Sequence, residues 1–156
     1  MLSNLPQTVL LVDDNEDDLL LFERACLKAG VGFNVRTATD GQHAISYLKG
    51  EGTYKDRVAY PRPGLVILDV NMPSVSGFEV LRWLRTASEC PDMVVIMFTS
   101  SAVEADVALA YELKANSYLV KPLQLDDFVT TIALIERYWL KLNLAPGEAS
   151  HAVRLN

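Results

Sequence analysis

The chain has 156 residues, of which 50% are hydrophobic and 22% charged, with a formal net charge of −6 and a pI of about 4.8. This length suits one domain with its own core, and the hydrophobic share excludes disorder throughout. The acidic balance argues against a domain whose main task is to grip nucleic-acid phosphates, because that task needs clustered Lys and Arg. Two cysteines are too few for a disulfide framework and favour a reducing compartment.

The apolar segments do not indicate export or insertion into a membrane. Residues 1–7 carry no basic side chain and no long apolar core, so they do not resemble a signal peptide. The longest apolar run, Met93–Phe98, is far shorter than the ~20 residues that cross a bilayer. We therefore expect a cytoplasmic protein with no membrane partner.

Predicted strands and helices alternate along the chain. Short β-favouring apolar runs predict buried strands at residues 8–12, 34–38, 64–68, 93–98 and 118–120. Each run is followed by a segment with helical spacing, at about residues 19–29, 41–49, 77–87, 107–113 and 125–142. Asp40 suits a helix start, and Gly30 and Gly50 suit helix ends.

This order predicts an α/β fold, a doubly wound (βα)5 five-stranded parallel sheet with flavodoxin-like strand order 2-1-3-4-5. We expect a single domain over residues 1–156, with its core at about 8–142 and a tail at 143–156. The polar segment 51–63, which contains two prolines, and the tail are both expected to be loops or partly disordered.

Polar residues follow four of the predicted strands. Asp13 and Asp14 follow the first strand, Asp69 the third, Thr99 ends the fourth, and Lys121 follows the fifth. Because parallel sheets form sites beyond the carboxyl ends of their strands, we expect these side chains to converge. Clustered carboxylates attract a cation, and their hard oxygen ligands favour Mg²⁺ or Ca²⁺ over zinc. Few protein ligands beside open positions favour Mg²⁺.

Each of these residues has an ordinary alternative role. Asp13 and Asp14 could simply stabilise the start of the first helix, and Thr99 could cap the fourth. Lys121 could be a solvated loop lysine, and Tyr118 a half-buried aromatic residue of an edge strand. These separate explanations leave the shared position of the residues on one sheet edge unexplained.

The motifs resemble the receiver domain of two-component response regulators over about residues 8–142. In chain order they are Val12-Asp13-Asp14, Asp69-Val-Asn-Met-Pro73 with Gly77, Thr99-Ser100 and Lys121-Pro122. Within the family, the chain is most similar to stand-alone regulators paired with bacterial phytochromes, notably in cyanobacteria. Residues 111–118, Tyr138-Trp139 and the long loop before the third strand carry this narrower resemblance.

The resemblance implies a phosphorylation site that uses Mg²⁺. Asp69 would accept a phosphoryl group from a phosphohistidine of a phytochrome-like sensor histidine kinase. Asp14 and Asp69 would bind Mg²⁺ through their side chains, Asn71 through its backbone carbonyl, and Asp13 through water. The chain would catalyse only its own phosphorylation and dephosphorylation, and so would be a signalling protein rather than an enzyme.

The resemblance also implies how such a site would respond. Lys121 would pair with Asp69 and then with the phosphoryl group, Thr99 would turn inward to bond that group, and Tyr118 would change rotamer. The family implies a cis peptide bond before Pro122, which is accessible only at proline. Lys114 departs from the family pattern, because receivers often have a glycine at this helix end. Glycine fits a left-handed backbone conformation without strain, whereas lysine in that conformation costs ~1 kcal/mol.

Output is expected through the surface of this one domain. Only a short tail follows the last predicted helix, so we expect no DNA partner. That helix carries a main apolar stripe and a second apolar row of Val129, Ala133 and Leu140. We expect a homodimer through this helix, in the region of Phe128, Ile132 and Trp139. The alternative is that the tail folds back over the second row.

Three other functions are compatible with such a fold. A flavodoxin-like electron carrier needs a Ser/Thr/Gly-rich phosphate loop after the first strand, where residues 13–18 are strongly acidic. A phosphohydrolase with an aspartate nucleophile usually has a second Asp two positions later, where this chain has Asn71. A receiver that acts by protein contacts alone would not need the complete set of charged residues.

Overall fold

The computed structural model describes residues 7–145, and its centre is one parallel sheet of five strands. The strands are β1 (Thr8–Val12), β2 (Asn34–Ala38), β3 (Leu65–Leu68), β4 (Val94–Thr99) and β5 (Ser117–Val120). They lie in the order β2-β1-β3-β4-β5, and every neighbouring pair is parallel. The predicted α/β fold and its strand order are therefore confirmed.

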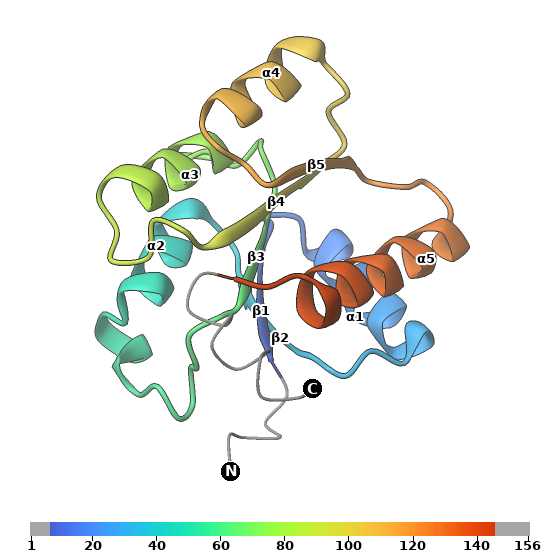
Figure 1. Cartoon of the computed structure of the whole chain (residues 1–156), viewed down its shortest axis with the longest axis horizontal. Coiled ribbons are helices and arrows are strands. Elements are labelled where there is room, and N and C mark those ends of the chain that lie inside the picture. The colour runs from blue at the N-terminus through green and yellow to red at the C-terminus, as the bar shows by residue number, and fades with distance from the viewer. Residues whose placement is uncertain (1–6, 146–156) are drawn as a thin grey trace.

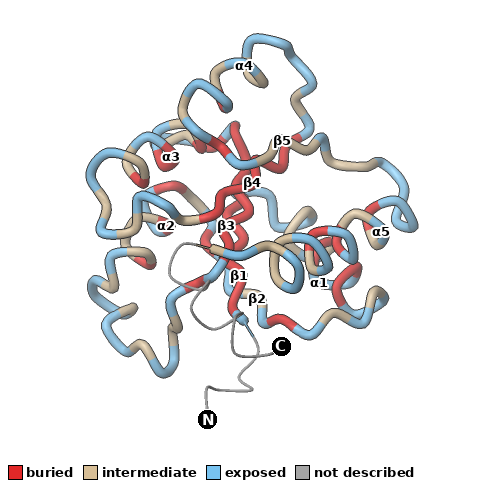
Figure 2. Tube along the Cα trace, in the orientation of Figure 1, coloured by how far each residue is buried: buried red, intermediate tan, exposed pale blue. Residues whose placement is uncertain are grey.

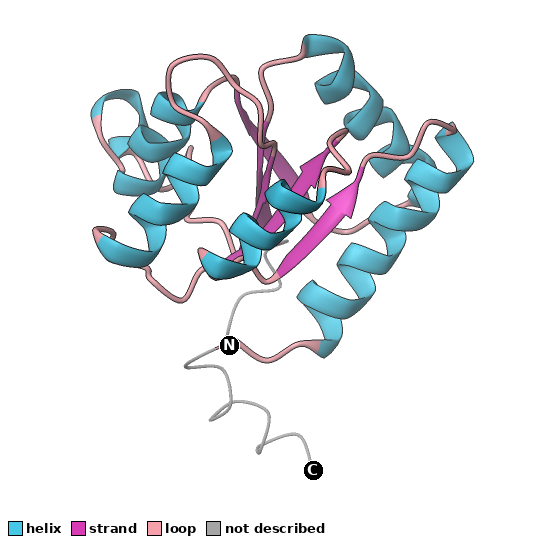
Figure 3. Ribbon diagram, turned by 90° about the horizontal axis from the view of Figure 1, so that it is seen from above, coloured by secondary structure: helices cyan, strands magenta, loops and turns pink. Residues whose placement is uncertain are grey.

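Helices connect the strands and cover both faces of the sheet. They are α1 (Glu16–Ala29), α2 (Gly41–Lys49), α3 (Gly77–Thr86), α4 (Glu104–Glu112) and α5 (Leu125–Ile135). Figures 1 and 3 show α1 and α5 on one face of the sheet and α2 and α3 on the other. The predicted ends are confirmed, since Asp40 caps α2 and both Gly30 and Gly50 adopt left-handed backbone conformations.

Two apolar clusters, one on each face, form the core. Alternate strand residues enter opposite clusters, as with Leu10 and Val12 on the α2–α3 face and Val9 and Leu11 on the α1–α5 face. Figure 2 shows the buried backbone concentrated along the central strands. Since both faces are covered, these strands read as continuous apolar runs without polar alternation.

The segment 51–63 is a loop with one short helical turn, and of the two expected alternatives the structure shows the loop rather than disorder. A short 3₁₀ helix, η1 (Gly52–Lys55), begins the segment, and the Arg57 guanidinium donates to the carbonyls of Tyr47 and Leu48 at the end of α2. The Tyr54 ring packs against Tyr47 and Tyr60, with ring centroids 5.0 and 5.1 Å apart. These contacts with α2 replace the interactions that a flexible polar loop would make with water. Most of the predicted tail, residues 146–156, lies outside the described residues.

The last predicted helix is two segments rather than one. The α-helix α5 ends at Ile135, and a π-helix, η2 (Glu136–Leu142), continues it. The Asn143 N–H donates to the Tyr138 carbonyl five residues earlier at 2.7 Å, which closes the wider turn. In this geometry the adjacent residues Trp139 and Leu140 both pack against the apolar cluster of the α1–α5 face.

Two of the three predicted dimer residues are not on the surface. Phe128 and Ile132 are 2% and 0% exposed, because α5 packs against α1 and the Phe128 ring meets Phe22 edge-on at 6.1 Å. They therefore cannot contact a partner, and that part of the prediction is wrong. Trp139 is half-buried in the same cluster.

The backbone differs from expectation at the peptide bond before Pro122 and agrees with it at Lys114. The peptide bonds of the described residues are all trans, so the expected cis bond before Pro122 is wrong. An X–Pro bond differs between its two forms by only about 0.5–1 kcal/mol, so a proline after lysine does not by itself determine the isomer. Lys114 has a φ of 68°, which is the left-handed conformation that the family resemblance implies for this helix end.

Within residues 7–145, no helix combines the length and the apolar character needed to cross a bilayer.

Candidate functional site

The sheet itself brings the predicted residues to one edge. Just beyond the strand ends, the Asp13 N–H donates to the Ala38 carbonyl at 3.1 Å, and the Asp69 N–H to the Val12 carbonyl at 3.0 Å. The Lys121 N–H donates to the Thr99 carbonyl at 2.8 Å. Parallel pairing thus continues one residue past the strands and aligns the three side chains at the carboxyl edge.

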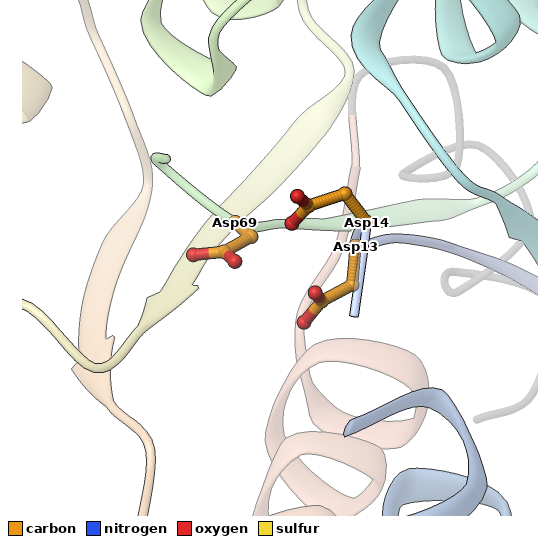
Figure 4. Close-up of side chains that lie close together, drawn as sticks. All are labelled: Asp13, Asp14 and Asp69. Carbon is orange, nitrogen blue, oxygen red and sulfur yellow. The ribbon is translucent and has the colours of Figure 1, made fainter. Parts of the chain in front are cut away.

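Three carboxylates converge at this edge. Oxygen atoms of Asp13, Asp14 and Asp69 all lie within 4.8 Å of one another (Figure 4). Asp13 and Asp69 are buried, whereas Asp14 is exposed, so the cluster opens to solvent on one side. An all-oxygen donor set with an open side is typical of a divalent metal site and fits Mg²⁺.

Lys121 supplies the positive charge inside the cluster. Its ammonium lies 2.6 Å from Asp13 Oδ2 and 3.4 Å from Asp69 Oδ2. Burial acts to lower the pKa of Lys121, but the hydrogen bonds to Asp13 and Asp18 outweigh it and raise that pKa above its usual range. Lys121 is therefore a cation at neutral pH.

The Lys121 ammonium has a further partner that the sequence pattern did not predict. It lies 2.8 Å from Oδ2 of Asp18, in the first turn of α1. The position of Asp18 in the sequence could have predicted this contact, since a helix that starts directly after a strand brings its first turn back over the carboxyl edge of the sheet. The acidic run 13–18 hid this signal, because acids in a first helical turn are common.

Burial and hydrogen bonds shift the pKa of Asp13 in opposite directions. Burial raises the pKa of the Asp13 carboxyl, while the bonds from Lys121 and from the Asn15 N–H oppose the rise. Asn15 is the residue that caps α1, because its Oδ1 accepts from the N–H groups of Asp17 and Asp18. The alternative role of Asp13 and Asp14 as caps of α1 is therefore not what the structure shows.

Thr99 and Tyr118 lie beside the cluster and meet at the loop after β4. Thr99 is fully buried, and its hydroxyl accepts the Ser101 N–H at 3.3 Å. The Tyr118 hydroxyl donates to the Ser101 carbonyl at 2.9 Å. Val103, and not Thr99, is the residue at the N-terminus of α4. One short loop therefore contacts both predicted switch residues.

The loop after Asp69 closes tightly against the site. Asn71 is exposed two residues after Asp69, and the Gly77 N–H donates to the Val70 carbonyl at 2.9 Å. A Cβ atom at Gly77 would overlap the Asp69 carbonyl oxygen. The start of α3 therefore needs a residue without a side chain at this position.

Comparison with known proteins identifies the family. Residues 9–133 match the response regulator receiver domain, and the chain belongs to this family. Receiver domains are non-enzymatic signalling modules that work as phosphorylation switches and partner with histidine kinases. The acidic triad of Asp13, Asp14 and Asp69 is the metal-type site expected of such a switch.

Two curated relatives match nearly the whole chain. The probable methanogenesis regulatory protein FilR2 of Methanothrix harundinacea is 34% identical over 145 residues, which cover 92% of this chain and 90% of FilR2. The response regulator Rcp1 of Synechocystis is 33% identical over 145 residues, which cover 93% of this chain and 97% of Rcp1.

Similar solved structures include regulators of light signalling. RPA3017, a response regulator in red light signalling of R. palustris, has a TM-score of 0.85 at 31% identity and covers 90% of this chain and 98% of its own. The phosphorylated cyanobacterial phytochrome response regulator RcpA has a TM-score of 0.82 at 31% identity, covering 91% and 99%. The Mn²⁺-bound form of Rcp1 has a TM-score of 0.79 at 32% identity, covering 91% and 100%.

Proposed function

We propose that this protein is a single-domain response regulator that accepts a phosphoryl group on Asp69 from a sensor histidine kinase in a Mg²⁺-dependent reaction. The observation that carries the proposal is the convergence of three carboxylates with one buried ammonium at the carboxyl edge of the sheet. We place the reaction in the cytoplasm and propose that the signal leaves through the surface of this domain.

Two contacts suit Asp69 to receive the group. The Val70 N–H donates to its Oδ1 at 2.8 Å, and Lys121 approaches its Oδ2. These contacts orient the carboxylate and partly offset its charge, so that an oxygen can approach an electrophilic phosphorus. Asp13, by contrast, is held by the shortest contact of Lys121 and by the Asn15 N–H.

The transfer exchanges one bond to phosphorus for another. A carboxylate oxygen of Asp69 forms a P–O bond as the P–N bond of the phosphohistidine breaks, and the imidazole departs with the bonding electrons. The Lys121 ammonium would hold a phosphoryl oxygen, and the Thr99 hydroxyl would turn to donate to another. Tyr118 would follow by changing rotamer, since its hydroxyl rests on the same loop.

The metal ligands are proposed from the same cluster. The side chains of Asp14 and Asp69 and the backbone carbonyl of Asn71 would hold Mg²⁺, and Asp13 would act through water. When bound, Mg²⁺ supplies positive charge that offsets the carboxylates and the transferred phosphoryl oxygens.

Intact mass measured after incubation with acetyl phosphate tests the proposal. We expect one phosphoryl adduct that requires Mg²⁺ and is absent from Asp69→Asn. Asp92→Asn, in an exposed loop elsewhere, serves as the control that removes one acid and keeps the adduct. A folded wild-type protein without an adduct in Mg²⁺, or an adduct that persists in Asp69→Asn, contradicts the proposal.

We propose a phytochrome-type kinase as the phosphoryl donor. The similarity to RcpA, a phytochrome response regulator, and to RPA3017, a response regulator in red light signalling, supports this choice. FilR2, a probable methanogenesis regulatory protein, is 34% identical against 31% for these two, so the kinase class is tested separately. Transfer from a phosphorylated bacterial phytochrome should exceed transfer from an unrelated histidine kinase at equal concentration, and equal transfer contradicts it.

We also propose a homodimer, on a different surface from the buried residues first considered. Leu134, Tyr138 and Leu142 are spaced by four along α5 and η2 and are 60%, 54% and 66% exposed. Exposed apolar side chains along one helix indicate a contact surface, and a second copy is the simplest partner. Light scattering should give a dimer at micromolar concentration that Leu134→Asp converts to a monomer. A wild-type monomer across this range contradicts it.

A further inference from the structure

We propose that Asp18 is a positioning residue that holds the Lys121 ammonium on the α1 side of the site and yields it when Asp69 is phosphorylated. This inference rests on the proposed function and adds a residue that opposes the phosphorylated state. It starts from the three contacts of the ammonium and from the different burial of its three partners.

The contacts use the full donor capacity of Lys121. An ammonium has three N–H groups, and here three carboxylates surround it, at 2.6 Å for Asp13, 2.8 Å for Asp18 and 3.4 Å for Asp69. The two short contacts come from β1 and α1, and the long one is to the proposed phosphoacceptor. The unphosphorylated protein therefore holds the cation closer to Asp13 and Asp18 than to Asp69.

A phosphoryl group on Asp69 requires Lys121 to move toward it. The group brings about −1.5 to −2 charges and three strong acceptor oxygens, so it competes for the ammonium. To make a short bond with one of these oxygens, Lys121 must lengthen a contact with Asp13 or with Asp18.

Burial determines which contact is given up. The Asp13 side chain is 4% exposed, so loss of the ammonium would leave a buried carboxylate with only the Asn15 N–H to offset its charge, which is unfavourable. The Asp18 side chain is 34% exposed, and water can take the place of the ammonium there. Asp18 is therefore the partner that releases Lys121 at the lower cost, and its carboxylate charge opposes the release.

Removal of this charge should favour the phosphorylated state. In Asp18→Asn the amide keeps the shape of the side chain but holds the ammonium less strongly. Asp17→Asn is the matched control, because Asp17 is an exposed neighbour in the same first turn of α1 and has the same charge. Asp18→Glu restores the carboxylate, and rescue by this variant separates positioning from a merely structural effect.

The experiment measures affinity for beryllofluoride, a phosphoryl analogue, at saturating Mg²⁺, followed by the amide NMR signal of Thr99. We expect Asp18→Asn to bind about fivefold more tightly than wild type, which corresponds to ~1 kcal/mol for a partly exposed ion pair. Its phosphoryl group, loaded from acetyl phosphate, should be lost more slowly by a similar factor. Asp17→Asn should match wild type, and Asp18→Glu should lie closer to wild type than Asp18→Asn does.

The outcomes separate this inference from the proposed function. If wild type binds the analogue and Asp18→Asn binds it equally or more weakly, the positioning role of Asp18 is wrong while the phosphorylation site stands. The role is also wrong if Asp17→Asn binds as tightly as Asp18→Asn. If wild type neither binds the analogue nor forms a phosphoryl adduct in Mg²⁺, the proposed function fails and the inference falls with it.

Discussion

Lys114 adopts its left-handed conformation where α4 ends and the chain turns toward β5. The Lys114 carbonyl accepts bonds from Nε and Nη2 of Arg85 at 3.0 and 2.9 Å. Arg85 also donates to the carbonyls of Pro91 and Met93 and to Asn116 Oδ1. This network on α3 holds the turn in place although a residue with a Cβ atom is strained there.

Glycine at position 114 should relieve that strain. We expect Lys114→Gly to raise the free energy of unfolding by about 0.5–1 kcal/mol, because glycine adopts positive φ without a steric penalty. Lys114→Ala removes the same exposed charge but keeps the Cβ atom, so it should stay within about 0.5 kcal/mol of wild type. Urea unfolding measures both values, and a destabilised glycine variant contradicts the argument.

At the scale of elements, the segment 51–63 behaves as an extension of α2. The Arg57 guanidinium bonds two carbonyls in the last turn of α2, and a third bond reaches the Tyr60 carbonyl at 3.3 Å. The Tyr47 hydroxyl donates to the Pro61 carbonyl at 2.9 Å. The end of α2 and the segment therefore stabilise one another, and Arg57 is the residue that joins them.

Removal of the Arg57 guanidinium should loosen this segment. We expect Arg57→Met to lower the free energy of unfolding by about 1–3 kcal/mol, since carbonyl groups lose charged donors. Chymotrypsin should also cleave faster after Tyr54 in the native protein. Lys55→Met, an exposed change in the same segment, is the control. Equal cleavage of the two variants would show that Arg57 does not hold the segment.

At the scale of the whole molecule, the chain has a net charge of −6 and gathers three acids at one sheet edge. Lys121 is the cation that contacts the cluster among the described residues, so the site keeps an excess of negative charge. A divalent cation that binds only the folded arrangement must stabilise the whole domain by linkage.

Mg²⁺ should therefore raise the melting temperature. At about five times its Kd the ion should contribute about 1 kcal/mol to the free energy of unfolding, and EDTA should remove this contribution. Asp14→Asn should lose most of the effect, because the variant lacks one proposed ligand, whereas Asp17→Asn should retain it. Calorimetry with and without Mg²⁺ tests this, and an Asp14→Asn variant that responds like wild type would exclude Asp14 as a ligand.

The sequence allowed the sheet and its polar edge to be predicted because both depend on local patterns. Buried apolar runs such as Thr8–Val12 mark the strands, and the rule for parallel sheets then places Asp13 and Asp69 together. The Asp40 cap and the Gly50 end of α2 likewise follow from residue type.

The features that were missed depend on contacts between distant residues. Arg57 orders its segment only because the carbonyls of α2 lie beside it, and Phe128 is buried because Phe22 of α1 lies opposite. The wide turns of η2 change the face on which Trp139 lies, which a constant helical period cannot predict. Asp18 likewise meets Lys121 across 103 positions of the chain.

The two apolar clusters have a spectroscopic consequence. The chain has two tryptophans, and the structure places Trp83 against the cluster of the α2–α3 face and Trp139 against the cluster of the α1–α5 face. Each side of the sheet therefore contains its own intrinsic fluorophore. In a Trp139→Phe variant, the indole emission reports on one side alone, and in Trp83→Phe on the other. The order in which the two layers loosen can thus be followed without attaching a dye.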